Sequence, residues 1–545
     1  MLVASERVGS SAVPGYPRPR SVTASSLPDL ATLLDAVLRE PAGLATRNAS
    51  GPTPAVTGIT HASDEVRPGD LFAALPGARR HGADFVPVAA RAGAVAVLTD
   101  EAGAGVAAAA GLPALVVADP RAALGPAAAR VYGDPTATLT VLGVTGTAGK
   151  TSTTYLIESG LRAAGHTAGL VGTVETRLGD LVVDSVRTTP EATDLQALLA
   201  AALEAGVTAV AMEVSSHALA MGRVSGTRFA ACGYTNFGLD HLDFHADAEE
   251  YFAAKAMLFD GRCAVEILNL DDPALRPLLR PATVTYSAAG DPAAAWRAVD
   301  ITGHGYGQRF TAVGPSGVAV ETGVALPGRH NVANALLAIA ALVAAGASPD
   351  VAAKGVAACP GVPGRLERVA APGPVTGVVD YAHKPDSIIA ALAALRALVA
   401  REGGGSGRVI CVIGAGGDRD RGKRPLMGRT AAQGADLVVV TDDNPRTEDP
   451  TGIRAQVLAG ARAAGGAQVL EVAGRREAIV EAVARAAPGD VVALLGKGHE
   501  RGQEVGGEVR RFDDRAELAA ALGARFGGVV PGAAAIGGAA IGGAA

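Results

Sequence analysis

Apolar, β-branched runs alternate with Ala- and Leu-rich stretches of helical period along most of the 545-residue chain. Alternation of this kind predicts α/β domains in which helices cover parallel sheets. The length favours about three or four domains at ~150 residues each. We therefore expect an N-terminal domain (27–136), a central domain (137–360) and a C-terminal domain (361–526), with the Pro- and Gly-rich "CPGVPGR" as a hinge between the last two.

The two ends of the chain do not share this alternation. Residues 1–26 lack the apolar segment of a secretory signal, and we expect a disordered extension. The Ala- and Gly-rich tail, 527–545, is too rich in glycine to span a membrane well and is expected to be flexible.

Charge and cysteine content exclude several classes of protein. The formal net charge of -6 gives no electrostatic case for nucleic acid. The cysteines lie far apart without a CxxC pair, which argues against a zinc site or a disulfide framework and fits a reducing cytoplasm. They are Cys232, Cys263, Cys359 and Cys411. We expect a cytoplasmic monomer without nucleic-acid or membrane partners.

Polar loops follow directly after several of the apolar runs. "TAGKTS" follows "TLTVLGVTG", "VSSH" follows "VTAVAME", "DRDRGKRP" follows "RVICVIGAGG", "NPR" follows "DLVVVTDD", and "KGHE" follows "DVVALLG". Ligands bind at the carboxyl ends of the strands in open parallel sheets. The sequence therefore predicts that at least two sheets present binding loops.

The stretch "GVTGTAGKTS" (143–152) lies between an apolar run and a helical stretch, as a phosphate-binding loop requires. Lys150 would reach the terminal phosphates of a nucleotide, and the Thr151 hydroxyl would bind Mg²⁺. Val144 stands where the strict pattern has glycine, so the alternative is a glycine-rich turn with an exposed lysine. The remaining predicted ATP-binding positions of the loop are Gly146, Thr147, Ala148, Gly149 and Ser152.

Three features downstream could complete a metal and nucleotide site. Glu213 ends an apolar run and could hold Mg²⁺, or could instead cap a helix or form a salt bridge. The stretch "DHLDFH" (240–245) could ligate a hard cation, or could be a polar loop with Asp-to-His hydrogen bonds. Lys255 lies among apolar helical residues, where a lysine that snorkels to solvent is the ordinary interpretation. In "GRHNVANALL", Asn331 could cap a helix, and Asn334 is better placed to face a ligand.

The stretch "VVVTDDNPRTEDP" (438–450) ends an apolar run in an Asn-Pro turn and Arg446. A guanidinium group can hold a carboxylate by two hydrogen bonds. The alternative is a turn in which Arg446 pairs with Glu448 or Asp449.

Together these motifs resemble the Mur ligase family, ATP-dependent amide ligases that build the peptide stem of peptidoglycan. The resemblance runs from about residue 56 to 526 and includes "GTAGKTS", "MEVSSHAL", "TNFGLDHLDFH", "AAKAMLF", "GRHNVANALLAIA", "PGRLE", "DYAHKPDS", "GDRDRGKRPLM", "DNPR" and "GKGHE". It implies an α/β fold with a UDP-binding N-terminal domain, a central P-loop ATPase domain and a Rossmann-like C-terminal domain.

The resemblance also implies roles for individual residues. Lys150, Glu213, His241 and Lys255 would be catalytic, and the last three would hold a second Mg²⁺ once Lys255 is carbamylated. Arg365 and Asp380 would close on ATP beside Asn334. Residues that would hold the muramoyl-peptide are Ser63, Thr188, Thr189, Ser215 and Arg223. Residues that would hold the amine substrate are Arg419, Asp443, Asn444, Pro445, Arg446, Gly496 and Glu500.

The implied reaction joins meso-2,6-diaminopimelate to the D-Glu γ-carboxylate of UDP-N-acetylmuramoyl-L-Ala-D-Glu. ATP would convert that carboxylate to an acyl phosphate, with Mg²⁺ neutralising phosphate charge. "DNPR" marks family members that accept diaminopimelate, and it argues against a lysine-adding or a D-alanyl-D-alanine-adding ligase. A P-loop regulator without ligase activity is the alternative from another class. Ala148, Arg187 and Met221 depart from residues common in the family.

Overall fold

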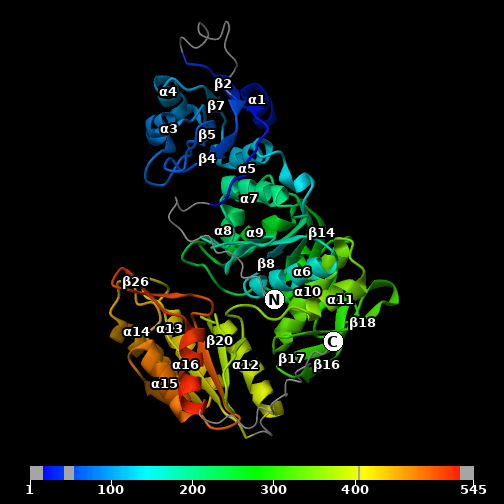
Figure 1. Ribbon diagram of the computed structural model, residues 1–545, viewed down its shortest axis with the longest axis vertical. Coiled ribbons are helices and arrows are strands. Elements are labelled where there is room, and N and C mark those ends of the chain that lie inside the picture. Colours follow the sequence, from blue (N-terminus) through cyan, green and yellow to red (C-terminus); the bar gives the residue numbers. More distant parts are fainter. Residues whose placement is uncertain (1–15, 42–54, 403–405, 528–545) are drawn as a thin grey trace, which may run out of the picture. The chain divides into compact units, whose positions relative to one another are not determined.

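The computed structural model describes residues 16–41, 55–402 and 406–527. The chain folds into two compact units (Figure 1). The first ends at Pro360, and the second contains 361–545 together with the short segments 305–307 and 326–328. The unit boundary therefore coincides with the predicted start of the C-terminal domain, whereas the N-terminal and central domains lie in one unit.

The N-terminal part of the first unit is a small sheet in the order β2-β7-β6-β5-β4, whose strands are parallel except at β2. Its strands are β2 (Val37–Arg39), β4 (Gly58–Thr60), β5 (Asp70–Ala73), β6 (Ala96–Thr99) and β7 (Ala114–Val116), and β1 (Ser25–Ser26) pairs with β3 (Ala55–Val56). Its helices are α1 (Leu27–Leu34), α3 (Val86–Ala92), α4 (Glu101–Ala109) and α5 (Pro120–Val131).

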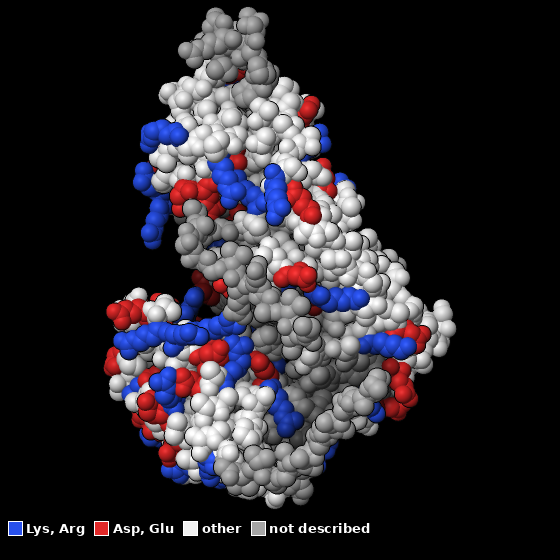
Figure 2. Space-filling view, in the orientation of Figure 1, with Lys and Arg blue, Asp and Glu red and all other residues white. Residues whose placement is uncertain are grey.

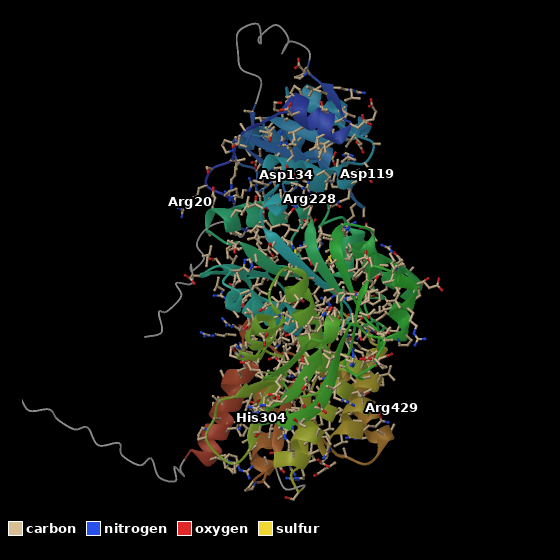
Figure 3. All side chains as sticks on the ribbon, turned by 90° about the vertical axis from the view of Figure 1, so that its right-hand side faces the viewer. Arg20, Asp119, Asp134, Arg228, His304 and Arg429 are labelled. Carbon is tan, nitrogen blue, oxygen red and sulfur yellow. A yellow bond between two sulfur atoms is a disulfide. The ribbon has the colours of Figure 1, made fainter. Side chains whose placement is uncertain are left out.

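Part of the segment 1–26, for which we expected disorder, has ordered contacts. Arg18 forms a salt bridge of 2.8 Å with the buried carboxylate of Asp70. The backbone N–H groups of Arg20 and Ser21 donate to the carboxylate of Glu204, which ends α7 (Ala192–Glu204) in the central part. Residues 16–26 thus connect the N-terminal and central parts of the unit, near the junction where Figure 3 labels Asp134 and Arg228. Residues 1–15 and the tail 528–545 lie outside the described residues.

The central part is built on a long mixed sheet in the order β11-β10-β9-β12-β8-β13-β14-β15-β16-β17-β18. Its middle strands run parallel, so the carboxyl ends of β12, β8 and β13 meet at one edge. The strands are β8 (Thr140–Thr145), β9 (Ala168–Val171), β10 (Thr176–Leu178), β11 (Leu181–Val183), β12 (Ala209–Glu213), β13 (Phe229–Tyr234), β14 (Cys263–Asn269), β15 (Val284–Ser287), β16 (Trp296–His304), β17 (Gly307–Val313) and β18 (Ala319–Val324). Besides α7, its helices are α6 (Lys150–Ala163), α8 (Ser216–Ala220), α9 (Ala248–Ala256), α10 (Arg329–Ala344) and α11 (Pro349–Ala357).

Two cysteines of this sheet form a disulfide, which the sequence argued against. Cys232 on β13 and Cys263 at the start of β14 are bonded, with Cα atoms 5.8 Å apart. The two residues lie on neighbouring strands, so the pairing of segments that are distant in the sequence brings them close, which sequence spacing does not reveal. Cys359 and Cys411 are buried, and burial raises the pKa of the Cys411 thiol to about 12, unlike a reactive thiol.

The second unit contains a sheet in the order β19-β20-β24-β21-β22-β23, in which β20, β24, β21, β22 and β23 are parallel. Two separate apolar clusters cover its two faces, one with α12 to α14 and the other with α15 and α16 (Figure 1). The strands are β19 (Glu367–Val369), β20 (Thr376–Asp380), β21 (Val409–Ile413), β22 (Leu437–Val440), β23 (Gln468–Glu471) and β24 (Val491–Leu495), with a hairpin of β25 (Gly502–Val505) and β26 (Glu508–Arg511). The helices are α12 (Pro385–Glu402), α13 (Lys423–Gly434), α14 (Pro450–Ala464), α15 (Arg475–Arg485) and α16 (Asp514–Phe526).

Acidic and basic side chains are interspersed over the visible face of this unit (Figure 2). Within the described residues, no helix combines the length and apolarity needed to cross a membrane.

Candidate active site

The phosphate loop connects β8 to α6, as the sequence predicts. Gly149 has φ 87°, and a Cβ atom there would lie 2.5 Å from Oδ1 of Asn334. Glycine is therefore required by both the left-handed backbone and the close approach of α10. The structure thus brings Asn334 against the loop, as predicted, and Asn331 accepts a hydrogen bond of 3.0 Å from the Asn334 amide.

Two lysine ammonium groups converge on one carbonyl of the loop. Nζ of Lys150 donates to the Gly146 carbonyl at 2.7 Å, and Nζ of Lys255 donates to the same oxygen at 2.9 Å. Lys255 is only 1% exposed and lies over the Tyr251 ring, so it does not snorkel to solvent, which was the alternative interpretation. Its side chain points inward to the loop, and its role as a carbamylated metal ligand stays a prediction.

Glu213 is the last residue of β12 and is buried beside the loop. Its Oε2 accepts hydrogen bonds from the Thr151 and Thr173 hydroxyls, both 3.1 Å, and its Oε1 accepts from the Thr173 N–H at 2.8 Å. A carboxylate and a hydroxyl 3.1 Å apart are hard oxygen donors that fit Mg²⁺. Neither alternative for Glu213 holds, since it caps no helix and its contacts are with threonines.

The loop that contains "DHLDFH" does not form the four-residue cation site considered for it. Nε2 of His241 lies 3.0 Å from Oδ2 of Asp240, the Asp-to-His contact that was the alternative interpretation. No three His, Cys, Asp or Glu side chains gather as a metal-binding group in the parts of the chain that the structure describes. His245 is instead buried, and desolvation lowers its pKa.

Sequence reasoning missed the residues that hold the loop in shape. Asn236 accepts from the Ala148 N–H at 3.1 Å and donates to the Ala148 carbonyl at 3.0 Å. Thr235 also donates to that carbonyl at 2.6 Å. Both residues belong to "TNFG" after β13, so their position after an apolar run was the signal that could have revealed them. Because both contacts of Ala148 use backbone atoms, alanine is tolerated where the family often has asparagine.

The predicted muramoyl-peptide residues gather around the end of β12. Thr189 donates to the Glu213 carbonyl at 2.9 Å and accepts from the Ser215 N–H at 3.1 Å. Thr188 contacts Thr173, the residue that donates to Glu213, at 3.0 Å. Hydroxyl contacts therefore run from the predicted acceptor site to the phosphate loop.

Glu191, a residue that the sequence did not single out, forms ion pairs with two arginines of this region. Glu191 pairs with Arg223 at 2.9 Å and with Arg121, from α5 of the N-terminal part, at 3.2 Å. Arg223 also donates to the sulfur of Met221 at 3.2 Å, so methionine still contacts the arginine. Ser63 lies in the turn after β4, in the N-terminal part of the unit.

Asp194 lies in the first turn of α7, close to these groups. Burial, with the charges of Glu65 and Glu191, raises its pKa to about 6, above its ordinary value of 3.8. The folded protein therefore binds this proton more tightly than the unfolded chain, and stability is lost as pH rises from about 4 to about 6. A shift of this size corresponds to at most ~3 kcal/mol, and partial exposure reduces it.

We expect Asp194→Asn to be more stable than the wild type at pH 7, by about 1–2 kcal/mol. The gain should shrink as the pH falls to about 4, because the wild-type carboxyl is then protonated. Urea unfolding at both pH values measures the difference, with the exposed Asp184→Asn as control. A less stable Asp194→Asn protein at pH 7 would contradict the assignment.

In the second unit, Arg446 has a left-handed backbone with φ 54°. Its N–H donates to the Glu504 carbonyl at 3.0 Å, and its carbonyl accepts from Gly506 at 2.7 Å, which fixes it against the β25–β26 hairpin. The guanidinium donates to the Gly417 carbonyl at 2.8 Å and lies 3.2 Å from the Glu504 carboxylate. A non-glycine residue rarely adopts a positive φ, because this conformation costs free energy. It persists only where surrounding contacts hold the backbone in place, as they often do at functional sites.

The ion pairs that we considered for Arg446 as a turn residue are not formed. Glu448 pairs instead with the buried Arg424 at 2.8 Å, and Asp449 caps α14. Arg424 and Arg421 lower the pKa of Glu448 to about 2. The Arg446 side chain is 23% exposed, so it is not fully enclosed by these contacts.

Other predicted amine-site residues lie beside it at the carboxyl ends of β22 and β24. Asn444 donates to Glu500 at 2.9 Å. Gly496 has φ 114°, and a Cβ atom there would lie 2.6 Å from Oδ2 of Asp443. Because Gly496 has no side chain, the Asp443 carboxylate can lie close to its backbone. Arg419 is exposed on the loop after β21.

Arg365 and Asp380 both belong to the second unit, whereas Asn334 belongs to the first. The Asp380 carboxylate accepts from the N–H groups of Leu366 and Ala382, and burial raises its pKa. The Arg365 guanidinium lies 4.7 Å from the centre of the Tyr381 ring. The approach of these two residues to a nucleotide stays a prediction.

A phosphate loop on one parallel sheet, and convergent polar loops on another, define a nucleotide-dependent α/β enzyme. Family models match most of the chain: "Mur ligase family, catalytic domain" over residues 55–132, "Mur ligase middle domain" over 144–342, and "Mur ligase, glutamate ligase domain" over 364–498.

Individual relatives agree with these matches. The UDP-N-acetylmuramoyl-L-alanyl-D-glutamate–2,6-diaminopimelate ligase of Streptomyces avermitilis is 52% identical over 518 residues, covering 93% of this chain and 98% of the relative. The protein of that name from Corynebacterium glutamicum is 44% identical over 518 residues, with 92% and 98% covered. A solved structure of a ligase with that name is 32% identical, with a TM-score of 0.63, and covers 87% of this chain and 97% of that one. The chain belongs to the Mur ligase family, and the predicted family and α/β architecture are confirmed.

Proposed function

We propose that the protein joins meso-2,6-diaminopimelate to the D-Glu γ-carboxylate of UDP-N-acetylmuramoyl-L-Ala-D-Glu, with ATP as co-substrate, during peptidoglycan precursor synthesis in the cytoplasm. The relatives that carry this name are 44–52% identical over 518 residues. The observation that carries the proposal is that the Arg446 side chain stays 23% exposed, two residues after Asn444, which is hydrogen-bonded to Glu500. An arginine beside a carboxylate suits an amine substrate whose far end carries both a carboxylate and an ammonium group.

The chemistry requires activation of a carboxylate, which is a poor electrophile at neutral pH. The γ-phosphoryl group of ATP moves to the carboxylate oxygen and ADP departs, giving an acyl phosphate. The uncharged amine then attacks the acyl carbon, and inorganic phosphate leaves as the amide forms. No enzyme nucleophile is required, so positioning and charge neutralisation dominate catalysis.

Within the first unit, contacts support several of the proposed roles, and the resemblance supplies the others. Lys150 lies in the loop that would cradle the phosphates, where its ammonium can follow the transferring charge. Glu213 and Thr151 would hold Mg²⁺, which when bound neutralises phosphate charge. Lys255, once carbamylated, and His241 would serve a second Mg²⁺ with Glu213. Thr188, Thr189, Ser215 and Arg223 would orient the muramoyl-peptide.

The test is phosphate release from ATP with UDP-N-acetylmuramoyl-L-Ala-D-Glu, comparing meso-diaminopimelate with L-lysine as the amine. We expect turnover with diaminopimelate to exceed turnover with lysine at least tenfold (~1.4 kcal/mol), because lysine lacks the second carboxylate. Equal rates, or a preference for lysine, would leave an amide ligase with a different amine substrate. Nucleotide binding without turnover of either amine would indicate a P-loop regulator.

A further inference from the structure

Lys497, in the "GKGHE" stretch after β24, is a fully buried lysine at the amine site. Its side chain is 0% exposed, and its chain neighbours Gly496 and Gly498 are also buried, whereas His499 and Glu500 are partly exposed. Its Nζ donates to Oδ1 of Asn444 at 2.9 Å and to Oε2 of Glu500 at 3.2 Å, and lies 3.9 Å from Oδ1 of Asp443. A buried ammonium group is stable only with such partners.

All three partners are residues to which we assign the amine substrate. Asp443 and Asn444 follow β22, and Glu500 follows β24, so Lys497 ties together loops from separate strands. Asn444 is further fixed because its Oδ1 also accepts from the Glu504 N–H at 3.1 Å, while its Nδ2 donates to Glu500. The Glu504 carboxylate in turn lies beside Arg446. One buried cation thus contacts Asn444 and Glu500 directly and is connected to the Arg446 segment through Asn444 and Glu504.

The contacts of Glu500 fall on one oxygen. Asn444 and Lys497 both donate to Oε2, and within the described residues no donor is recorded at Oε1. The side chain is 33% exposed. Oε1 of Glu500 can therefore accept a hydrogen bond from a substrate ammonium group, while Oε2 is held by Asn444 and Lys497.

We propose that Lys497 is a positioning residue for the amine substrate: it aligns the Glu500 carboxylate and the Asn444 amide for the ammonium group at the far end. Without its charge, Asp443 and Glu500 would be two partly buried carboxylates whose remaining nearby cation among the described residues, Arg475, lies 4.0 Å from Asp443 and donates no recorded hydrogen bond to either carboxylate. Lys497 does not contact substrate itself, because its ammonium group is enclosed. This inference rests on the proposed function.

The experiment uses the full chain and Lys497→Met, which keeps an unbranched side chain but removes the charge and the donors. We expect the KM for meso-diaminopimelate to rise about tenfold to thirtyfold, the range for a charge-assisted hydrogen bond. The KM values for ATP and for the muramoyl-dipeptide should stay within about twofold. Lys354→Met, at an exposed lysine of α11, is the matched control and should resemble the wild type.

A second pair of variants separates positioning from general stability. If Lys497 acts through Glu500, Lys497→Met should add little to Glu500→Gln, so the double variant should match Glu500→Gln within about threefold. Lys497→Gln, which can still donate a hydrogen bond, should give an intermediate KM.

Several outcomes would overturn the inference. They are an unchanged KM for diaminopimelate, a parallel rise in the KM for ATP, effects that multiply in the double variant, or loss of the folded state in both Lys497 variants. Failure of the proposed function itself would be recognised separately, because the wild-type protein would then release no phosphate with diaminopimelate.

Discussion

Glu213→Gln should lower kcat for phosphate release by about a hundredfold to a thousandfold without unfolding the protein. Losing the charge that helps to hold Mg²⁺ removes several kcal/mol of transition-state stabilisation, at ~1.4 kcal/mol per tenfold. The amide can still accept from the Thr173 N–H, which now donates to Oε1 at 2.8 Å. The Thr151 and Thr173 hydroxyls can rotate to accept from the new NH₂ group. The Glu213→Gln substitution therefore keeps the shape and the hydrogen bonds of the side chain but removes its negative charge.

The measurement is kcat as a function of Mg²⁺ concentration, at saturating ATP and amine. Half-maximal activity of Glu213→Gln should require more Mg²⁺ than the wild type. Glu175→Gln is a matched control, since this carboxylate accepts from Tyr155 at 2.9 Å and lies outside the phosphate loop. If both variants kept wild-type kcat and Mg²⁺ dependence, Glu213 would be only an acceptor that orders the threonines around it.

Sequence periodicity predicted most of the fold, because a parallel sheet requires little more of a sequence than apolar runs for the strands and amphipathic stretches for the helices that cover them. The strand before the phosphate loop, Thr140–Thr145, and the helix after it, Lys150–Ala163, lie where the pattern placed them. Polar loops after apolar runs gather at sheet edges because neighbouring strands are parallel. This rule also explains why Glu213 and Asn444 could be recognised as candidate site residues.

Features set by contacts between distant segments were beyond sequence reasoning. The Cys232–Cys263 bond depends on β13 and β14 being neighbours in the sheet. The inward course of Lys255 depends on where α9 meets the phosphate loop, and helical period alone could not distinguish it from snorkelling. Lys497 belongs to the "GKGHE" motif, yet nothing in its neighbours along the chain reveals that its partner Asn444 lies on the loop after another strand.

Arg446→Ala should lower kcat/KM for meso-diaminopimelate by about a hundredfold to a thousandfold, and should change kcat/KM for L-lysine by less than about threefold. Truncating one partner of a desolvated, hydrogen-bonded charge pair costs ~2–5 kcal/mol, and this substrate alone has the second carboxylate. Glu504, whose carboxylate lies 3.2 Å from Arg446, is 40% exposed, so the existing ion pair competes only weakly for the guanidinium. The measurement is phosphate release with each amine over a range of concentrations.

The left-handed backbone at Arg446 requires its own control. Arg446→Asn removes the guanidinium but tolerates φ 54° better than alanine does. If the lost interaction is with the substrate carboxylate, both variants should show the same loss for diaminopimelate and the same small change for lysine. If Arg446→Ala loses activity with both amines while Arg446→Asn keeps it, the residue serves the turn against the β25–β26 hairpin. Selectivity for diaminopimelate must then come from the other predicted groups at that edge of the sheet, among which Arg419 carries the positive charge that a second carboxylate requires.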